Sequence, residues 1–198
     1  MNIFGRHRLR HLAAGVAFAA LASSVLIGCG RRAPAPAAVS SNQNSASPSA
    51  PAPADATPTT YIGYRNQRFG FTFDLPSDFV GGPPPEDGDG LRWTSPDGSA
   101  SVTAFGETNA FFGESAASAL NDCKRALTSG GGHMTYSALK SNEYVCTGYT
   151  GDGAVHYEYG LVGTTNLYEI SWSYPRNDKS RWDAAVRRSV SSFKPGEL

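Results

Sequence analysis

The chain has 198 residues and carries 17 Lys and Arg side chains against 17 Asp and Glu side chains. Arg6, Arg8 and Arg10 lie within residues 1–28, which hold no acidic residue, so the rest of the chain has 14 basic and 17 acidic residues, a net charge of −3. This excludes the basic face that nucleic-acid binding needs, and it gives no attraction to anionic lipid. Attachment to a membrane would have to be covalent.

Residues 1–28 have the pattern of a secretory signal peptide. A short basic segment precedes an apolar run over residues 12–27, which is shorter than the roughly 20 residues that a membrane-spanning helix needs. The run ends in Leu26-Ile27-Gly28-Cys29, which resembles the lipobox of bacterial lipoproteins. The resemblance implies cleavage between Gly28 and Cys29 and a diacylglycerol thioether on Cys29. The alternative is an ordinary signal peptide followed by a chance cysteine.

The expected location is therefore the cell envelope, where a lipid anchor holds the exported chain to a membrane. Attachment through two or more acyl chains is stable, whereas one chain holds only marginally. In lipoproteins of Gram-negative bacteria, an Asp after the lipidated cysteine favours the inner membrane. Gly30 at this position implies an outer-membrane lipoprotein facing the periplasm if the host is Gram-negative.

Residues 29–60 are expected to form a disordered tether behind the lipidated cysteine. Residues 30–60 contain nine Ala, six Pro and five Ser and no aromatic residue. Such a segment cannot bury enough apolar surface to offset the entropy lost on ordering, and its Pro-Ala alternation favours extended conformations.

Residues 61–198 are expected to form a single globular domain. All three Trp and all nine Tyr of the chain lie at or after Tyr61, and a segment of this length can build one hydrophobic core. Period-two alternation predicts strands, and apolar residues at helical spacing predict helices. The expected strands lie at 69–75, from 91, around 102–104, and at 133–140, 143–150, 154–163 and 167–174; the expected helices are 114–128 and a last one capped by Asp178.

The expected fold class is α+β, a mostly antiparallel sheet of about six to seven strands with two main helices packed on it, in the order β-β-β-α-β-β-β-β-α. Several segments resemble a known family: Arg68-Phe69-Gly70-Phe71 followed by Leu75-Pro76, then Ser95-Pro96-Asp97-Gly98, Tyr174-Pro175 and Ser192-Phe193. They are similar to bacterial envelope proteins of the PsbP-like fold, which photosystem II extrinsic proteins and a Ran-binding nuclear transport factor share. The resemblance implies an accessory or binding role, and it transfers no catalytic residue.

Cys123 and Cys146 are the two cysteines that follow Cys29. In an exported protein, one remaining pair indicates a disulfide. Cys123 is on the apolar stripe of the first predicted helix, and Cys146 is in the middle of a predicted strand, so the bond would join helix to sheet. Two free buried thiols are the alternative.

Few residues point to catalysis, and no cofactor is expected. His133 and His156 are the two histidines outside the signal segment. Ser115 lies in a Gly-x-Ser segment that lacks the final Gly of a nucleophile elbow. His156 and Glu158 share a strand face, with Glu169 possible opposite them, and could begin a metal site. The favoured interpretation is a solvated polar face with cross-strand pairs.

The last strands are rich in aromatic residues, most of which are expected in the core; an exposed group of them would mark a binding surface. The function expected is a non-catalytic binding or accessory module for a protein or cell-wall partner. Two alternatives stay open: an envelope hydrolase or metal-dependent enzyme that uses His156 and Glu158, and a purely structural envelope protein. The aromatic residues concerned are Tyr149, Tyr157, Tyr159, Tyr168, Trp172 and Tyr174.

Overall fold

A computed structural model describes residues 57–58 and 60–196. The predicted signal peptide, the predicted lipidation at Cys29 and nearly all of the predicted tether lie outside these described residues. Within the described part, no helix combines the length and the apolar character needed to cross a membrane.

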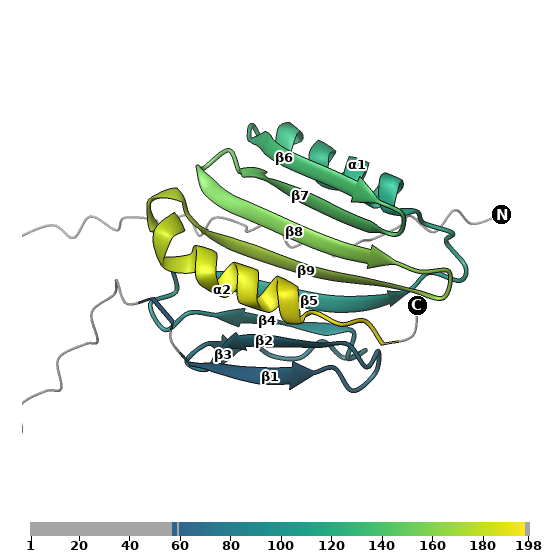
Figure 1. Ribbon diagram of the computed structural model, residues 1–198, viewed down its shortest axis with the longest axis horizontal. Helices are drawn as coiled ribbons and strands as arrows, with labels where there is room; N and C mark the ends of the chain where they lie inside the picture. The colour runs from purple at the N-terminus through teal and green to yellow at the C-terminus, as the bar shows by residue number, and fades with distance from the viewer. Residues whose placement is uncertain (1–56, 59, 197–198) are drawn as a thin grey trace, which may run out of the picture. The chain divides into compact units, whose positions relative to one another are not determined.

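Nine strands, two α-helices and one 3-10 turn form the domain, and Figure 1 shows their arrangement. The strands are β1 (Tyr61–Arg65), β2 (Thr72–Pro76), β3 (Val80–Gly81), β4 (Gly90–Thr94), β5 (Ser101–Thr108), β6 (His133–Lys140), β7 (Glu143–Tyr149), β8 (Ala154–Val162) and β9 (Asn166–Pro175). The helical elements are α1 (Ala116–Ser129), η1 (Arg176–Asp178) and α2 (Lys179–Ser192).

The strands form two sheets. β1 and β2 make a two-stranded sheet, and the other strands make a seven-stranded sheet in the order β3-β4-β5-β9-β8-β7-β6. Every strand pair is antiparallel. This confirms the predicted α+β class, a mostly antiparallel sheet with two main helices.

The beginning of the domain differs from the predicted strand order, because five strands rather than three precede α1. β1 and the two-residue β3 were not predicted from the sequence. The first predicted strand also begins later than expected, because Phe69 lies in the turn between β1 and β2. There the Asn66 side chain accepts hydrogen bonds from the backbone N–H groups of Arg68 and Phe69, and Gly70 takes a φ of 72° that favours glycine.

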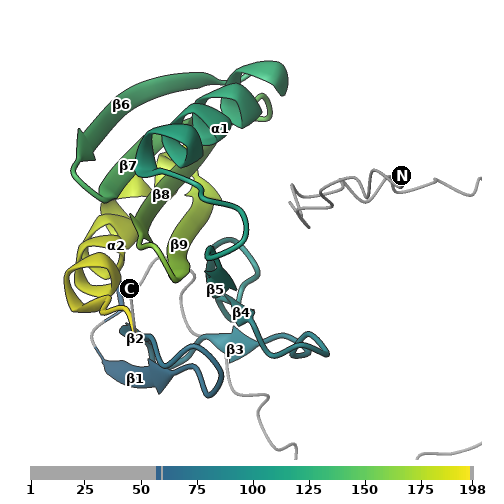
Figure 2. The same ribbon diagram turned by 90° about the vertical axis from the view of Figure 1, so that its right-hand side faces the viewer.

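The two helices lie on opposite faces of the large sheet, as the turned view in Figure 2 shows. α1 packs against β6, β7 and β8, whereas α2 packs against β9 and β2. Neighbouring residues of one strand accordingly enter different cores. Leu161 and Tyr168 pair across β8 and β9 and belong to the core under α2, while Val162 and Leu167 pair next to them and belong to the core under α1.

The core under α2 is the larger of the two and is rich in aromatic rings. Phe73 of β2 and Phe71, which directly precedes β2, belong to it, and β9 adds Trp172; all three are at most 1% exposed. Trp182 of α2 lies with its ring centroid 5.5 Å from that of Phe79 and 6.5 Å from that of Trp172. Offset and edge-on ring contacts of this kind add to the stabilisation that burial itself gives.

Both helices follow the predicted apolar stripes but begin differently. The Ser115 side chain caps α1 by accepting a hydrogen bond from the Ser118 N–H, and Gly130 follows the last residue of the helix. Asp178 precedes α2 as predicted, but its side chain makes no capping hydrogen bond. The predicted cap is therefore wrong. The turn η1 leads directly into α2, so Asp178 has a φ of −95° and a ψ of 13° rather than the extended backbone typical of a capping residue.

Asp97 connects the turn between β4 and β5 to α2. Its carboxylate accepts hydrogen bonds from Ser95 Oγ at 2.6 Å and from the Ser99 N–H at 3.0 Å, and it pairs with Arg181 Nη1 of α2 at 2.6 Å. Partial burial acts to raise the pKa of Asp97, but the hydrogen bonds from Ser95, Ser99 and Arg181 outweigh it and lower the pKa well below its ordinary value.

Because the pKa of Asp97 is lower in the folded protein than in the unfolded chain, its contribution to stability is complete above the unfolded pKa of about 3.9. This contribution is lost as the pH falls through the folded pKa. We expect the stability advantage of the wild type over Asp97→Asn to shrink as the pH falls from about 5 towards 2. Urea unfolding at several pH values measures it, with Asp78→Asn, at an exposed position, as the control. Equal pH dependence in the wild type and Asp97→Asn would contradict the prediction.

Candidate functional site

A group of polar side chains lies on the face of the large sheet that α1 partly covers. The Tyr144 hydroxyl, on β7, lies 2.9 Å from Glu158 Oε1 on β8 and 3.0 Å from Glu169 Oε2 on β9. His156 Nε2 lies 3.1 Å from the other carboxylate oxygen of Glu158. Three neighbouring strands thus contribute to one connected network.

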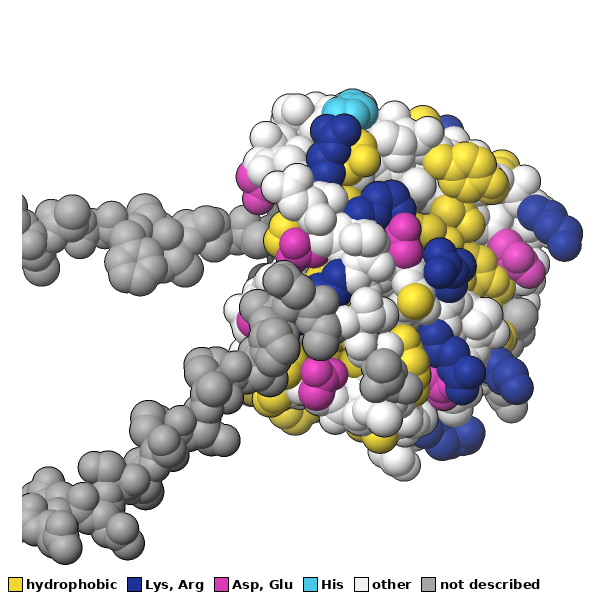
Figure 3. Space-filling view, turned by 60° about the vertical axis from the view of Figure 1, so that its left-hand side comes forward, with side chains coloured by type: hydrophobic (Ala, Val, Ile, Leu, Met, Phe, Trp, Pro, Cys, Tyr) yellow, Lys and Arg dark blue, Asp and Glu magenta, His cyan; other side chains and the backbone are white. Residues whose placement is uncertain are grey.

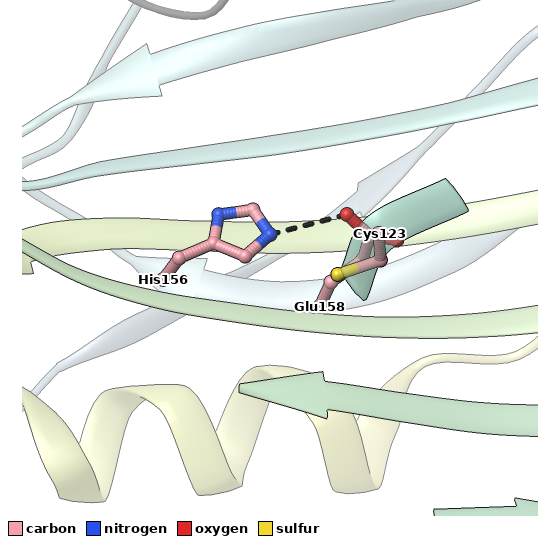
Figure 4. A group of neighbouring side chains, drawn as sticks. All are labelled: Cys123, His156 and Glu158. Atoms are coloured by element: carbon pink, nitrogen blue, oxygen red, sulfur yellow. Dashed lines mark hydrogen bonds and ion pairs between the residues drawn. The ribbon is translucent and has the colours of Figure 1, made fainter. Parts of the chain in front are cut away.

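The disulfide lies directly beside this network. Cys123 of α1 is bonded to Cys146 of β7, as the sequence predicts, with their Cα atoms 6.4 Å apart. The candidate ligand atoms of Cys123, His156 and Glu158 all lie within 4.8 Å of one another. Figure 4 shows the imidazole directed at the Glu158 carboxylate, with the Cys123 sulfur next to that carboxylate.

The register of β7 and β8 explains how these residues meet. The turn at Gly151–Gly153 sets Cys146 opposite Glu158 and Tyr144 opposite Gly160. Gly160 also pairs with Glu169 on β9. A Cβ atom at Gly160 would come within 2.1 Å of the Tyr144 ring. The glycine therefore lets the ring lie across β8 and reach Glu169.

In this network the neutral phenol of Tyr144 lies between the carboxylates of Glu158 and Glu169. Burial first, and then the negative charges of Glu169 and Glu158, raise the pKa of Tyr144 well above its usual value. Tyr144 therefore stays protonated and serves as a hydrogen-bond donor. Of the three neighbouring residues Cys123, His156 and Glu158, Cys123 is bonded in the disulfide. His156 and Glu158 are therefore the two that could bind a metal ion in the oxidised protein.

The hydrolase alternative gains no support from these positions. Ser115, its candidate nucleophile, serves as the cap of α1. Of the metal candidates, His156 and Glu158 do contact each other, and Glu169 accepts a hydrogen bond from the same Tyr144 hydroxyl that contacts Glu158. Tyr144 was not predicted as a site residue. The sequence does carry a signal for it: counting outward from the Asp152-Gly153 turn pairs Tyr144 with Gly160, which leaves room for the aromatic ring.

The opposite face of the same strands carries a second surface. α2 crosses in front of the lower strands in Figure 1, whereas β6, β7 and β8 continue above it with no helix in front. Two neighbouring rows of side chains run across these strands on that face. One row consists of Tyr136, Thr147 and Tyr157, and the other of Ala138, Val145 and Tyr159. We call this surface the open tyrosine face and define it by Tyr136, Ala138, Val145, Tyr157 and Tyr159.

The open tyrosine face is partly accessible to solvent. Tyr136 is 57% exposed, and its other members are half-buried. In Figure 3 this side of the domain turns to the right, where hydrophobic side chains reach the surface among Lys and Arg side chains. Burial first, and then the negative charge of Glu143, raises the pKa of Tyr159 to about 12. Its phenol is therefore uncharged at neutral pH.

The aromatic residues singled out in the sequence separate into two groups. Tyr168, Trp172 and Tyr174 are buried in the core, as expected for most of them. Tyr149, Tyr157 and Tyr159 are half-buried against that core, and the Arg176 guanidinium lies 4.4 Å from the centroid of the Tyr149 ring. Tyr136 was not predicted as a surface residue, and β6 has a bulge between Met134 and Tyr136 that disturbs its alternation there.

Comparison with known proteins rests on structure. No protein family matches the sequence, and no curated protein is significantly similar to it. The solution structure of cyanobacterial PsbP (CyanoP) from Synechocystis superposes with a TM-score of 0.54 at 10% identity, covering 68% of this chain and 92% of that one. The domain has a PsbP-like fold. A crystal structure from Bacteroides thetaiotaomicron gives a TM-score of 0.32 at 13% identity, covering 63% of this chain and 44% of that one.

The predicted PsbP-like fold is thereby confirmed. At this identity the likeness concerns the arrangement of strands and helices, not a site. Binding surfaces on a shared fold have to be argued from the side chains of each chain. For this PsbP-like domain, the open tyrosine face and the network around Tyr144 are the two surfaces to consider.

Proposed function

We propose that this chain is an exported lipoprotein, anchored through Cys29, whose PsbP-like domain is a non-catalytic module that binds an envelope protein through the open tyrosine face. The half-exposed tyrosines of that face carry the proposal. Tyrosine gives a large rigid contact area with a polar end, and it is enriched in protein interfaces. The PsbP-like fold is in keeping with an accessory role.

Two features of the surface favour a protein partner. The open tyrosine face ends at β6, the last strand of the large sheet in the described residues. An extended segment of a partner can add to a free strand edge and pack alternate side chains against the adjoining face. Leu139 of β6 is 51% exposed and pairs with Tyr144, so it offers an apolar contact on the other face of the same edge.

Anchoring is tested by Cys29→Ser. We expect the variant to leave the membrane fraction for the soluble fraction of the envelope, because the lipid supplies the attachment and the net charge does not. Fractionation followed by immunoblotting measures this, and metabolic labelling with an alkyne fatty acid reports the lipid itself. Asp78→Asn, at an exposed position of the domain, is the control and should stay in the membrane fraction. Unchanged membrane attachment of Cys29→Ser would refute the anchor.

Partner binding is tested by placing a photo-crosslinking phenylalanine derivative at Tyr136. We expect one discrete crosslinked protein from this position, and we expect Tyr136→Ala to weaken its binding by about 1–2 kcal/mol. The exposure of Tyr136 keeps the cost of the substitution to the fold small.

Phe111 provides the matched control for the crosslink. It is 90% exposed in the loop between β5 and α1, and that loop is held by the Asn109 side chain, which donates to the Glu114 and Gly163 carbonyls. The same product from both positions, or none from Tyr136, would overturn the assignment of the open tyrosine face. The latter result would favour a purely structural role.

A further inference from the structure

Four potential metal ligands from three elements meet under α1. The ligand atoms of Cys123, His156 and Glu158 lie within 4.8 Å of one another, and Cys146 is bonded to Cys123. In the disulfide neither sulfur is a thiolate, and the thiolate is the form of cysteine that binds metal. The oxidised protein therefore has an incomplete set consisting of one imidazole and one carboxylate.

Reduction would complete that set. Two thiolates, one imidazole and one carboxylate are a four-ligand combination of the types that bind Zn²⁺ tetrahedrally. Thiolate and imidazole ligands favour zinc over magnesium or calcium, which prefer oxygen. The ligands would come from the buried stripe of α1 and from two paired strands, so the fold itself would hold them together.

The surroundings of Glu158 and His156 fit such a role. The Tyr144 hydroxyl donates to Glu158 from one side and contacts Glu169 beyond it, and hydrogen bonds of this kind orient a metal-binding carboxylate. The two cysteines are at most 3% exposed, whereas the side chains of His156 and Glu158 are 22% and 13% exposed. An ion can therefore enter from the histidine side.

We propose that reduction of the Cys123–Cys146 disulfide converts this cluster into a zinc site formed by Cys123, Cys146, His156 and Glu158. The reductant is a dithiol of the Cys-x-x-Cys class. It gives two electrons and two protons to the disulfide and becomes a disulfide itself. The two thiols formed on this chain release their protons when Zn²⁺ binds. The proposal goes beyond the proposed partner binding and uses the opposite face of the sheet.

The test uses the purified protein, reduced with a phosphine and then freed of reductant without oxygen. Titration with Co²⁺ should produce thiolate-to-cobalt charge-transfer bands and the intense visible bands of a tetrahedral site. Zn²⁺ should displace the cobalt at one ion per chain. The oxidised protein should give neither signal.

Variants separate a built site from a pair of reactive thiols. We expect His156→Ala and Glu158→Gln to weaken zinc binding by at least about 10-fold, since even the partners around a ligand typically contribute about 10- to 100-fold. His133→Ala, at the other described histidine, should bind as the wild type does. Equal zinc affinity in His156→Ala, Glu158→Gln and the wild type, or equal binding by the oxidised protein, would overturn the proposal.

Circular dichroism covers the case in which the reduced chain loses structure. Zinc should then restore the spectrum of the folded protein in the wild type and fail to do so in His156→Ala at the same concentration. Reduced wild-type protein that shows neither cobalt bands nor zinc-dependent recovery of the spectrum would also overturn the proposal.

Discussion

Replacing Trp182 by alanine is expected to lower the free energy of unfolding by about 3–5 kcal/mol. The side chain is 1% exposed and forms a cluster of three rings with Phe79 and Trp172, which also contact each other. It is the largest buried side chain that α2 contributes to the core. Its loss would leave a cavity between the helix and the sheet, which the surrounding side chains can fill only in part.

Trp182→Phe is the matched variant, and its expected cost is clearly smaller. It keeps an aromatic ring in the site and removes the indole N–H, which is buried without a hydrogen-bond partner among the described residues. An unsatisfied buried donor is itself unfavourable. Urea unfolding followed by circular dichroism measures both variants. If Trp182→Ala and Trp182→Phe lowered the free energy of unfolding by amounts that agree within about 0.5 kcal/mol, packing of the large ring would not be the source of stability.

Removal of the disulfide is the second change with a large expected effect. The bond joins residues 23 positions apart, and closing a loop of this size is worth about 3–3.5 kcal/mol in the chain-entropy model. We expect the double variant Cys123→Ser, Cys146→Ser to lose about this much stability. It should also loosen α1, which the bond ties to β7.

The measurement compares urea unfolding of the double variant with that of oxidised and reduced wild-type protein. A chelator keeps metal out, and all proteins carry Cys29→Ser so that no third thiol can exchange. Reduction of the wild type should reproduce the loss seen in the double variant. An unchanged midpoint after reduction would contradict the prediction, as would the labelling of both cysteines in unreduced, denatured protein.

The central part of the fold was predictable from local pattern. Val155 and Leu161 on β8 alternate with polar residues, and the stripe of Leu120, Cys123 and Leu127 indicates the buried side of α1. β1 and β3 carry no such signal. β1 contains Gly63 and exposes Ile62, and β3 has two residues, so pairing with β2 and β4, rather than their own residue pattern, defines them as strands.

The candidate site shows the same division between local and non-local information. Strand periodicity sets His156 and Glu158 on one face, and helix periodicity directs Cys123 towards the sheet. That these three lie together depends on the register between β7 and β8 and on where α1 crosses those strands. The bridge from Tyr144 to Glu169 further requires an open position at Gly160, which the residue pattern of β8 alone does not indicate and only the pairing with β7 reveals.

The order of the strands also determines when this domain can fold. β5 lies between β4 and β9 in the sheet, and Thr72 of β2 forms a bridge with Lys194 near the end of the described chain. β5 therefore lacks one of its two neighbours in the sheet, and β2 lacks its bridge to Lys194, until the last thirty or so residues of the chain are available. Such distant pairings slow folding. Under the export that we propose, such a delay would help to keep the chain unfolded until it reaches its export channel.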